Sequence, residues 1–276
     1  MKQEDVVLLL TACVRPSNMI LTELQDPEER LRQYLSAVGY YMANTKCKIV
    51  LCNNSGDDFA GRFDYGDRFE YLFFDGNGYD RSLGKGYGEF EIVKYAVAHS
   101  RLIAEAKQVV KITGRLVFPD AFRSINLTLR LLRLPSDTVI TRFCYYAPFA
   151  HSEFVFAPKG FFERFVAEEN VINDTAGYYF EHLLHDGIVR SGFQYVSFVK
   201  PIKKIGVSGT ANLQYSNDFH SRMYQLIDIY MFYQKRSEEL KGTDARLSKA
   251  MRRISVGTHT WLRVYKFFRK RFAKQP

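Results

Sequence analysis

The chain has 276 residues, of which 46% are hydrophobic and 25% charged, a composition that excludes disordered and collagen-like proteins. Its net charge of +9 comes almost entirely from residues 251–276, which carry eight Lys or Arg and no Asp or Glu. Because an enzyme that acts on nucleic acid usually spreads its cations over one face of the folded body, we expect no nucleic-acid partner.

Strands and helices are predicted to alternate along the first part of the chain. The run Val6–Thr11 is continuously apolar or β-favouring, which is typical of a strand buried on both faces, and Asp26 with Pro27 is typical of a helix start. In chain order, we expect a strand at Val6–Thr11, a helix from Asp26, strands at Lys48–Cys52 and Phe69–Phe74, a helix after Gly84 with the inner face Ile92, Tyr95, Ala96, His99 and Ile103, and a strand at Val109–Thr113. This alternation predicts an α/β, Rossmann-like fold with a mostly parallel sheet flanked by helices and a ligand site at the carboxyl ends of its strands.

The rest of the chain continues with further strands and helices. We expect strands at Thr138–Tyr145, Phe154–Phe156 and Tyr195–Phe198, and helices at Gly160–Glu168 and Gly177–Asp186. From Asp218 onward the pattern is helical.

The cysteines and the apolar runs bear on where the protein works. Four cysteines without CxxC spacing favour buried free thiols over disulfides or a zinc site. No apolar run reaches the ~18 residues of a membrane-spanning helix, and the start of the chain lacks the features of a secretory signal. We therefore expect a cytoplasmic protein.

The glycine-rich segment Gly84–Glu89 is the first motif with chemical potential. It differs from the dinucleotide motif GxGxxG because Glu89 occupies the third glycine position, and it does not match a Walker loop. Its alternate glycines allow close approach of a ligand, Lys85 supplies a charge, and the following helix supplies a positive end. The alternative is a surface turn.

The second motif is KITGR at Lys111–Arg115. A strand that ends in Thr-Gly-Arg presents a hydroxyl, an amide and a guanidinium at one edge of the sheet, groups that match the oxygens of a diphosphate. The alternative is a strand-end turn with a solvated Arg115.

Taken in order, the motifs resemble those of a known enzyme family. NNSGDD, GKGYGE and KITGR resemble the donor half of GT-A glycosyltransferases, and LLLTACVRP, LCNNSG, GKGYGE and VVKITGR resemble bacterial enzymes that build capsule, O-antigen and lipopolysaccharide glycans. The resemblance covers residues 6–118 and continues more weakly through HSEFVF, GYYFEHLLHD and GVSGT. It implies a hexosyltransferase that moves a sugar from a nucleotide-sugar donor, with UDP favoured, to a lipid-linked surface glycan.

The resemblance also implies a domain division and a set of binding residues. A GT-A-like domain would span residues 1–216, with a donor half at 1–118 and an acceptor half at 119–216, and a C-terminal helical extension would span 217–276. The implied nucleotide-sugar-binding residues are Thr11, Arg15, Asn53, Asn54, Ser55, Lys85, Gly86, Gly88, Lys111, Thr113, Gly114 and Arg115.

The metal motif of this family is missing. Lys111–Arg115 stands where GT-A enzymes keep an Asp-x-Asp pair, and the chain contains no such pair. We therefore expect no metal cofactor, with Arg115 and Lys111 or Lys85 stabilising the leaving nucleoside diphosphate instead. Mg²⁺ or Mn²⁺ stays open as an alternative through Asp57, Asp58 and Asp75.

The segment 174–186 is predicted to supply the catalytic base. An inverting transfer requires a group that deprotonates the acceptor hydroxyl, and Glu181 and Asp174 flank a run of aromatic residues. We expect Glu181, Asp174 and Arg115 to be catalytic, and Tyr178, Tyr179 and His185 to bind the acceptor. The alternative is that both acids cap helices.

Two other functions remain open on the sequence. His182, His185 and Asp186 share a helical stretch and are metal-ligating residue types, which allows a metal-dependent hydrolase, although no HExxH motif is present. A noncatalytic adaptor that binds a membrane or nucleic acid through its basic tail is the other alternative.

The C-terminal tail predicts a location. Trp261, Val264, Tyr265, Phe268 and Phe272 form an apolar stripe, and Arg263, Lys266, Arg269, Lys270 and Arg271 cover its flanks. A basic amphipathic helix with aromatic anchors is typical of an anionic membrane surface. We expect residues 251–276 to hold the protein on the inner face of the cytoplasmic membrane. A helix packed on the body and an RNA-binding tail are the alternatives.

Overall fold

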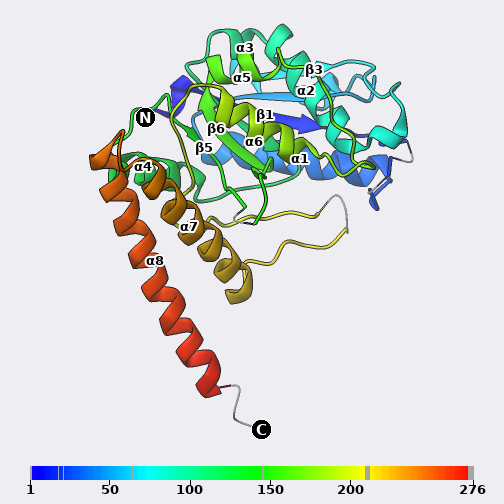
Figure 1. Cartoon of the computed structure of the whole chain (residues 1–276). Coiled ribbons are helices and arrows are strands. Elements are labelled where there is room, and N and C mark those ends of the chain that lie inside the picture. Colours follow the sequence, from blue (N-terminus) through cyan, green and yellow to red (C-terminus); the bar gives the residue numbers. More distant parts are fainter. Residues whose placement is uncertain are drawn as a thin grey trace.

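The computed structural model describes residues 2–17, 19–20, 22–63, 65–144, 146–208 and 212–272, with side chains in the last helix through residue 263. The strands are β1 (Val6–Ala12), β2 (Lys48–Asn53), β3 (Phe69–Phe73), β4 (Gln108–Thr113), β5 (Val139–Ile140), β6 (Phe154–Pro158) and β7 (Tyr195–Val196). The α-helices are α1 (Pro27–Asn44), α2 (Lys85–His99), α3 (Arg101–Ala104), α4 (Ala121–Leu132), α5 (Lys159–Phe165), α6 (Phe180–Arg190), α7 (Phe219–Glu239) and α8 (Ala245–Phe272). Figure 1 shows their arrangement.

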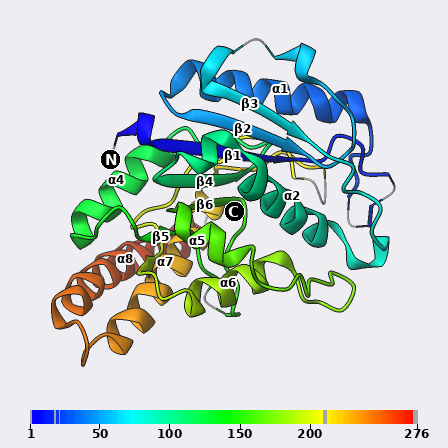
Figure 2. The same cartoon turned by 90° about the horizontal axis from the view of Figure 1, so that it is seen from above.

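The strands form one mixed sheet with the order β3-β2-β1-β4-β6-β5-β7. Neighbours from β3 to β4 are parallel, β6 runs antiparallel to β4 and β5, and β7 is parallel to β5. Helices flank both faces, as Figure 2 shows from above. The predicted class, a mostly parallel α/β sheet flanked by helices with a C-terminal helical extension, is confirmed.

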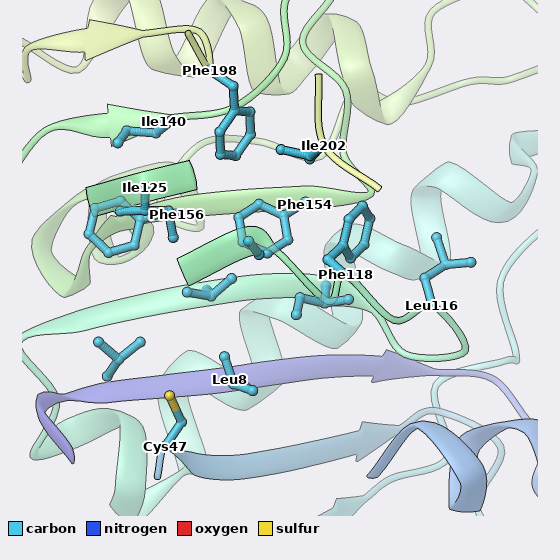
Figure 3. Close-up of a cluster of buried hydrophobic side chains, with 14 of the residues drawn as sticks. Leu8, Cys47, Leu116, Phe118, Ile125, Ile140, Phe154, Phe156, Phe198 and Ile202 are labelled. Carbon is cyan, nitrogen blue, oxygen red and sulfur yellow. The ribbon is translucent and has the colours of Figure 1, made fainter. Parts of the chain in front are cut away.

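The core lies on both faces of β1, which explains its continuous apolar run. Val6, Leu8 and Leu10 pack with residues of α1, α4, α7 and α8, whereas Val7 and Leu9 pack with residues of α2, α5 and α6. A parallel strand covered on both faces has no solvent-exposed side to carry polar residues. Figure 3 shows part of the first cluster, which includes Leu8 of β1 and the rings of Phe154 and Phe156 of β6.

Several predicted elements differ in extent from the observed ones. The helix after Gly84 ends at His99, which is exposed, and Ile103 belongs to α3. Ser100 breaks the helix because its Oγ accepts a hydrogen bond from the Ile103 amide at 3.0 Å and donates one to Glu70 at 2.6 Å. The strand expected at Thr138–Tyr145 is reduced to β5, because the chain turns into a hairpin in which Phe143 faces Ala150.

Helix α4 lies in a segment for which the sequence analysis predicted no element. Its buried Ile125, Leu129 and Leu132 recur at helical spacing, so the periodicity that identifies a helix was present. The two C-terminal helices run side by side away from the sheet (Figure 1), and Ile229 and Met251 join the first core cluster. The domain boundaries at 118 and 216 stay a prediction.

Within the described part of the chain, no helix has the length and apolar character needed to span a bilayer. Through residue 263, α8 packs by Leu247, Met251 and Leu262, while Trp261 is 69% exposed. The remaining stripe and flank residues of the predicted amphipathic tail, 264–272, have no described side chains, and 273–276 lie outside the described residues.

Candidate active site

A pocket of about 260 Å³ opens at the carboxyl ends of the parallel strands. Thr11 from β1, Asn54 after β2, and Thr113 and Arg115 at the end of β4 line it. Lys85 at the start of α2 and Glu181 in the first turn of α6 complete its walls. The structure therefore brings Lys85 and Arg115 together in one pocket, where an open α/β sheet binds its ligands.

The cationic wall of the pocket includes a residue that the sequence analysis did not select. Arg30 of α1 lies near Arg115 and donates from Nε to the Cys13 carbonyl at 2.7 Å. Arg115 donates from Nη1 to Gln33 at 3.0 Å, and burial lowers its pKa, with the charge of Arg30 acting in the same direction. Two buried guanidinium groups held close together favour an anionic ligand, because an anion relieves their repulsion.

The turn at Gly114 allows the end of β4 to approach the end of β1 closely. Its amide donates to the Thr11 carbonyl at 2.9 Å, and a Cβ at Gly114 would lie 2.6 Å from that oxygen. Glycine is therefore required sterically, and the backbone of Gly114 joins β4 to β1 behind the pocket.

Lys111 has a different position from the one expected for a diphosphate ligand. Its side chain is 1% exposed, and Nζ donates to the carboxylate of Glu89 and, at 2.7 Å, to the Ser152 carbonyl. Strand alternation places Lys111 on the face that α2 covers, so Glu89 neutralises its charge beneath the pocket. The prediction that Lys111 faces the ligand is corrected to a buried ion pair.

Glu89 organises the floor of the pocket. Besides Lys111, its Oε1 accepts hydrogen bonds from Thr11 at 3.1 Å and Thr113 at 3.4 Å, two residues that are register partners on β1 and β4. In the sequence, Glu89 was distinctive only as a departure from the GxGxxG motif. Its position four residues after Lys85 on a helix was the available signal, since that spacing places both on one face.

Asp174 caps a helix rather than facing the pocket. Its Oδ2 accepts the Gly86 amide at 3.1 Å at the start of α2, and its own amide donates to the Leu83 carbonyl at 2.9 Å. A Cβ at Gly86 would lie 2.7 Å from Oδ1, which explains the glycine, and Gly84 has a φ of +83°. Asp174 is therefore corrected from a base to a helix-capping acid, and Gly86 also lies away from the pocket.

Glu181 is the predicted base that does line the pocket. Its Oε1 accepts a hydrogen bond from Ser152 Oγ at 2.6 Å. Burial raises the pKa of Glu181; the Ser152 bond opposes this increase and the charge of Glu89 adds to it. A carboxylate with a raised pKa is a better proton acceptor, so its position and basicity suit general-base catalysis.

The residues after β2 divide between the pocket and the scaffold. Asn54 lines the pocket and donates to Asn77 at 3.1 Å. Asn53 is fully buried and accepts the Val14 amide at 3.2 Å, Ser55 accepts the Arg15 amide at 2.9 Å, and Arg15 pairs with Asp57 at 2.6 Å. Asn53, Ser55 and Arg15 therefore hold the loops around the pocket, although each was expected to contact the ligand directly.

Gly88 lines the pocket, where its missing side chain leaves room for the Tyr79 hydroxyl.

A buried network of charged residues supports the wall of the pocket at Glu153. Glu153 lines the pocket and pairs with Lys204 at 2.6 Å, and Lys204 lies 3.4 Å from the centroid of the Tyr215 ring. Burial alone would raise the pKa of Glu153, but the charges of Lys204 and Arg142 outweigh it and lower the pKa. The network joins β6 to the segment before α7, and sequence spacing gave no signal for it.

The predicted acceptor residues lie outside this pocket. Tyr178 donates to Asp186 at 3.0 Å, Tyr179 stacks on His182, and His185 contacts Asp186 at 3.1 Å. Among the described residues, no group of three or more His, Cys, Asp or Glu side chains is arranged to hold a metal ion. The arrangement around His182 therefore gives the hydrolase alternative no support.

Comparisons with known proteins give structural likeness without a family. No family model matches the chain, and no curated protein matches its sequence. An inositol-1-phosphate CTP transferase from T. maritima aligns with a TM-score of 0.46 and 11% identity, covering 82% of this chain and 96% of that one. A 4-diphosphocytidyl-2C-methyl-D-erythritol synthase aligns with a TM-score of 0.40 and 11% identity, covering 82% and 99%. A cytidylyltransferase from Leptospira borgpetersenii serovar Hardjo-bovis aligns with a TM-score of 0.38 and 11% identity, covering 90% and 98%.

Proposed function

We propose that the protein is a glycosyltransferase that moves a sugar from a nucleotide-sugar donor, with a UDP-sugar favoured, to a lipid-linked bacterial surface glycan. The observation that carries the proposal is that one pocket contains both a cationic wall and a carboxylate whose pKa is raised by burial. Arg30, Arg115 and Lys85 form the wall, and Glu181 supplies the carboxylate.

These residues support a balanced transfer step. The acceptor hydroxyl oxygen forms a bond with the anomeric carbon while the bond from that carbon to the diphosphate oxygen breaks. Glu181 takes the hydroxyl proton, and the electron pair leaves with the nucleoside diphosphate, whose charge Arg115 and Lys85 stabilise. Because base and leaving group lie on opposite sides of the reacting carbon in such a displacement, the proposed reaction inverts configuration.

We propose that the cations of the pocket replace a metal on the diphosphate. Arg15 already engages Asp57, one of the acids that could hold Mg²⁺ or Mn²⁺, at 2.6 Å. A guanidinium presents fixed donors that match phosphate oxygens, so it supplies both charge and geometry. Donor binding should accordingly be equal with and without added Mn²⁺.

Replacement of Lys85 by Ala should weaken UDP binding by about 10-fold to 100-fold, because a charge-assisted contact contributes about 1.5–3 kcal/mol. Isothermal titration with UDP, GDP, CMP and dTDP, each with and without Mn²⁺, measures the change in affinity and identifies the nucleobase that the protein prefers. Lys94→Ala is the matched control, since Lys94 is an exposed lysine on the same helix. If none of the four nucleotides binds the unmodified protein, the proposed function fails.

We further propose that α8 attaches the enzyme to an anionic membrane on its cytoplasmic side, where a lipid-linked acceptor is available. Lys249, Arg252, Arg253 and Arg263 are exposed, as is Trp261. Exposed cations and an exposed aromatic side chain on one helix support attachment to anionic lipid.

The double variant R252Q/R253Q should bind phosphatidylglycerol vesicles about 30-fold more weakly, since each cation near such a surface contributes about 1 kcal/mol. Vesicle co-sedimentation measures the change, and phosphatidylcholine vesicles should retain little protein. R62Q/K94Q removes two exposed cations from the sheet domain and should bind as the unmodified protein does. Equal loss in both variants would contradict attachment through α8. A protein that binds vesicles but no nucleotide would instead be the noncatalytic adaptor.

A further inference from the structure

A second pocket, of about 340 Å³, lies between α6, α7 and the hairpin that follows β5. Phe143, Cys144, His185, Tyr195, Lys235 and Arg236 are among its lining residues. None of these except His185 entered the sequence analysis as a ligand-binding residue. A pocket of this volume admits a ligand of substantial size.

The walls of the second pocket are aromatic. Phe143 stacks on Phe232 with ring centroids 4.8 Å apart, and the ring centroid of Tyr195 lies 5.6 Å from that of Phe143. Tyr146, in the same wall, is 78% exposed. Rings held together in a concave surface bind an apolar chain, because they bury its surface at little cost in side-chain entropy.

One end of the second pocket is cationic. Lys235 and Arg236 are adjacent on α7, and Glu239 is the lining acid that accompanies them. The Arg236 guanidinium lies 4.3 Å from the Tyr195 ring centroid and donates from Nη1 to Glu239 at 2.8 Å. Lys235 is exposed. Two cations against one lining acid leave this part of the pocket with a net positive charge, which favours a phosphate group.

The two pockets are neighbours along α6. Glu181 lines the first pocket and His185 lines the second, and residues four apart on a helix lie on one face about 6 Å apart along its axis. The hairpin makes the same connection, since Phe143 and Cys144 line the second pocket and Ser152 lines the first. A molecule held in the second pocket can therefore extend a hydroxyl towards Glu181.

We propose that the second pocket binds the phosphate-bearing, apolar end of the acceptor, with Lys235 and Arg236 on the phosphate and the aromatic walls on the chain. This inference rests on the proposed function, because it assigns the acceptor side of the same reaction. The expected acceptor is an alkyl or isoprenyl phosphate that carries a sugar, and a neutral glycan is not expected to bind in the second pocket.

The cysteines of the chain report on both pockets. Cys13 lines the first pocket and Cys144 lines the second, and both are half-buried. Cys47 and Cys52 are buried, and burial raises the pKa of both thiols, that of Cys47 to about 12. Alkylation by iodoacetamide, followed residue by residue with mass spectrometry, should therefore modify Cys13 and Cys144 first.

Geranyl monophosphate should slow alkylation of Cys144 at least fivefold with UDP present in excess, whereas UDP alone should slow Cys13 and leave Cys144 unchanged. Inorganic phosphate tests the anion alone and octyl glucoside tests a neutral chain, and each should protect Cys144 less than geranyl monophosphate does. Lys235→Gln should reduce the protection several-fold, and Arg236→Gln provides a second variant. Lys94→Gln should leave protection intact.

The outcomes separate this inference from the proposed function. Unchanged Cys144 alkylation under saturating geranyl monophosphate, or equal protection by octyl glucoside, would overturn the phosphate assignment while nucleotide protection of Cys13 still supported the transferase. Protection of Cys144 without protection of Cys13 by any nucleotide would retain a phosphate-amphiphile site and remove its role as an acceptor site.

Discussion

The variant Glu181→Gln is expected to transfer sugar about 10²-fold to 10⁴-fold more slowly, the range by which a positioned general base accelerates proton transfer. Gln keeps the size of the side chain and its hydrogen bond with Ser152 but accepts no proton. Affinity for UDP should be unchanged, because Arg30, Arg115 and Lys85 remain. The measurement is single-turnover transfer to an acceptor with UDP release as the readout, together with UDP titration.

The pH profile provides an independent check on the same residue. Because burial raises the pKa of Glu181, the rise of kcat/KM with pH should be centred above the ordinary range of a glutamate, and this limb should be missing in the variant.

The raised pKa of Glu181 also makes the stability of the fold depend on pH in a definite direction. The folded protein binds this proton more tightly than the unfolded chain, so the Glu181 contribution to the unfolding free energy falls as pH rises from the ordinary glutamate pKa through the raised one.

That sign separates catalysis from folding. Above the raised pKa, Glu181→Gln should be at least as stable as the unmodified protein, so slow transfer by the variant in that pH range is not caused by unfolding. Glu169→Gln is the matched control, since Glu169 is exposed, and it should keep full activity. A Glu181→Gln variant within threefold of the unmodified rate would exclude Glu181 as the base.

The variant Lys111→Met should lower the free energy of unfolding by about 3–5 kcal/mol, the usual effect of removing one partner of a buried ion pair. Met fills a similar volume, but Glu89 then loses its ion-pair partner beneath the pocket. Urea unfolding followed by circular dichroism gives the difference. Lys94→Met changes the same residue type at an exposed position and should cost less than about 0.5 kcal/mol.

A double variant tests whether the ion pair is the cause. K111M/E89Q removes both charges, so it should recover at least half of the lost stability, whereas independent effects would add. A Lys111 variant that unfolds at the same urea concentration as the unmodified protein, but no longer binds UDP, would mean that Lys111 contacts the ligand after all.

The sequence alone determined the elements of the donor half and the edge of the sheet where they meet. The apolar run at Val6–Thr11 and the cap at Asp26 are local signals, and β1 and α1 occur where they predict. Polar clusters after Cys52, before Lys85 and after Thr113 converge because parallel strands expose their carboxyl ends along one edge. Past residue 118, α4 was missed although its apolar spacing was present, and β5 was predicted too long because the hairpin after it is set by tertiary contacts.

Which side chains face the pocket depends on the packing between elements. Lys111 and Arg115 belong to one motif, yet the face covered by α2 receives Lys111 and the pocket receives Arg115. Glu181 was the first candidate for the base and Asp174 the second, and both flank the same aromatic run. Their roles differ because Asp174 caps the amide end of α2, whereas Glu181 bonds with Ser152 at the pocket. Periodicity predicts on which face of its own element a residue lies, whereas its partner comes from another element at a distance and orientation that packing sets.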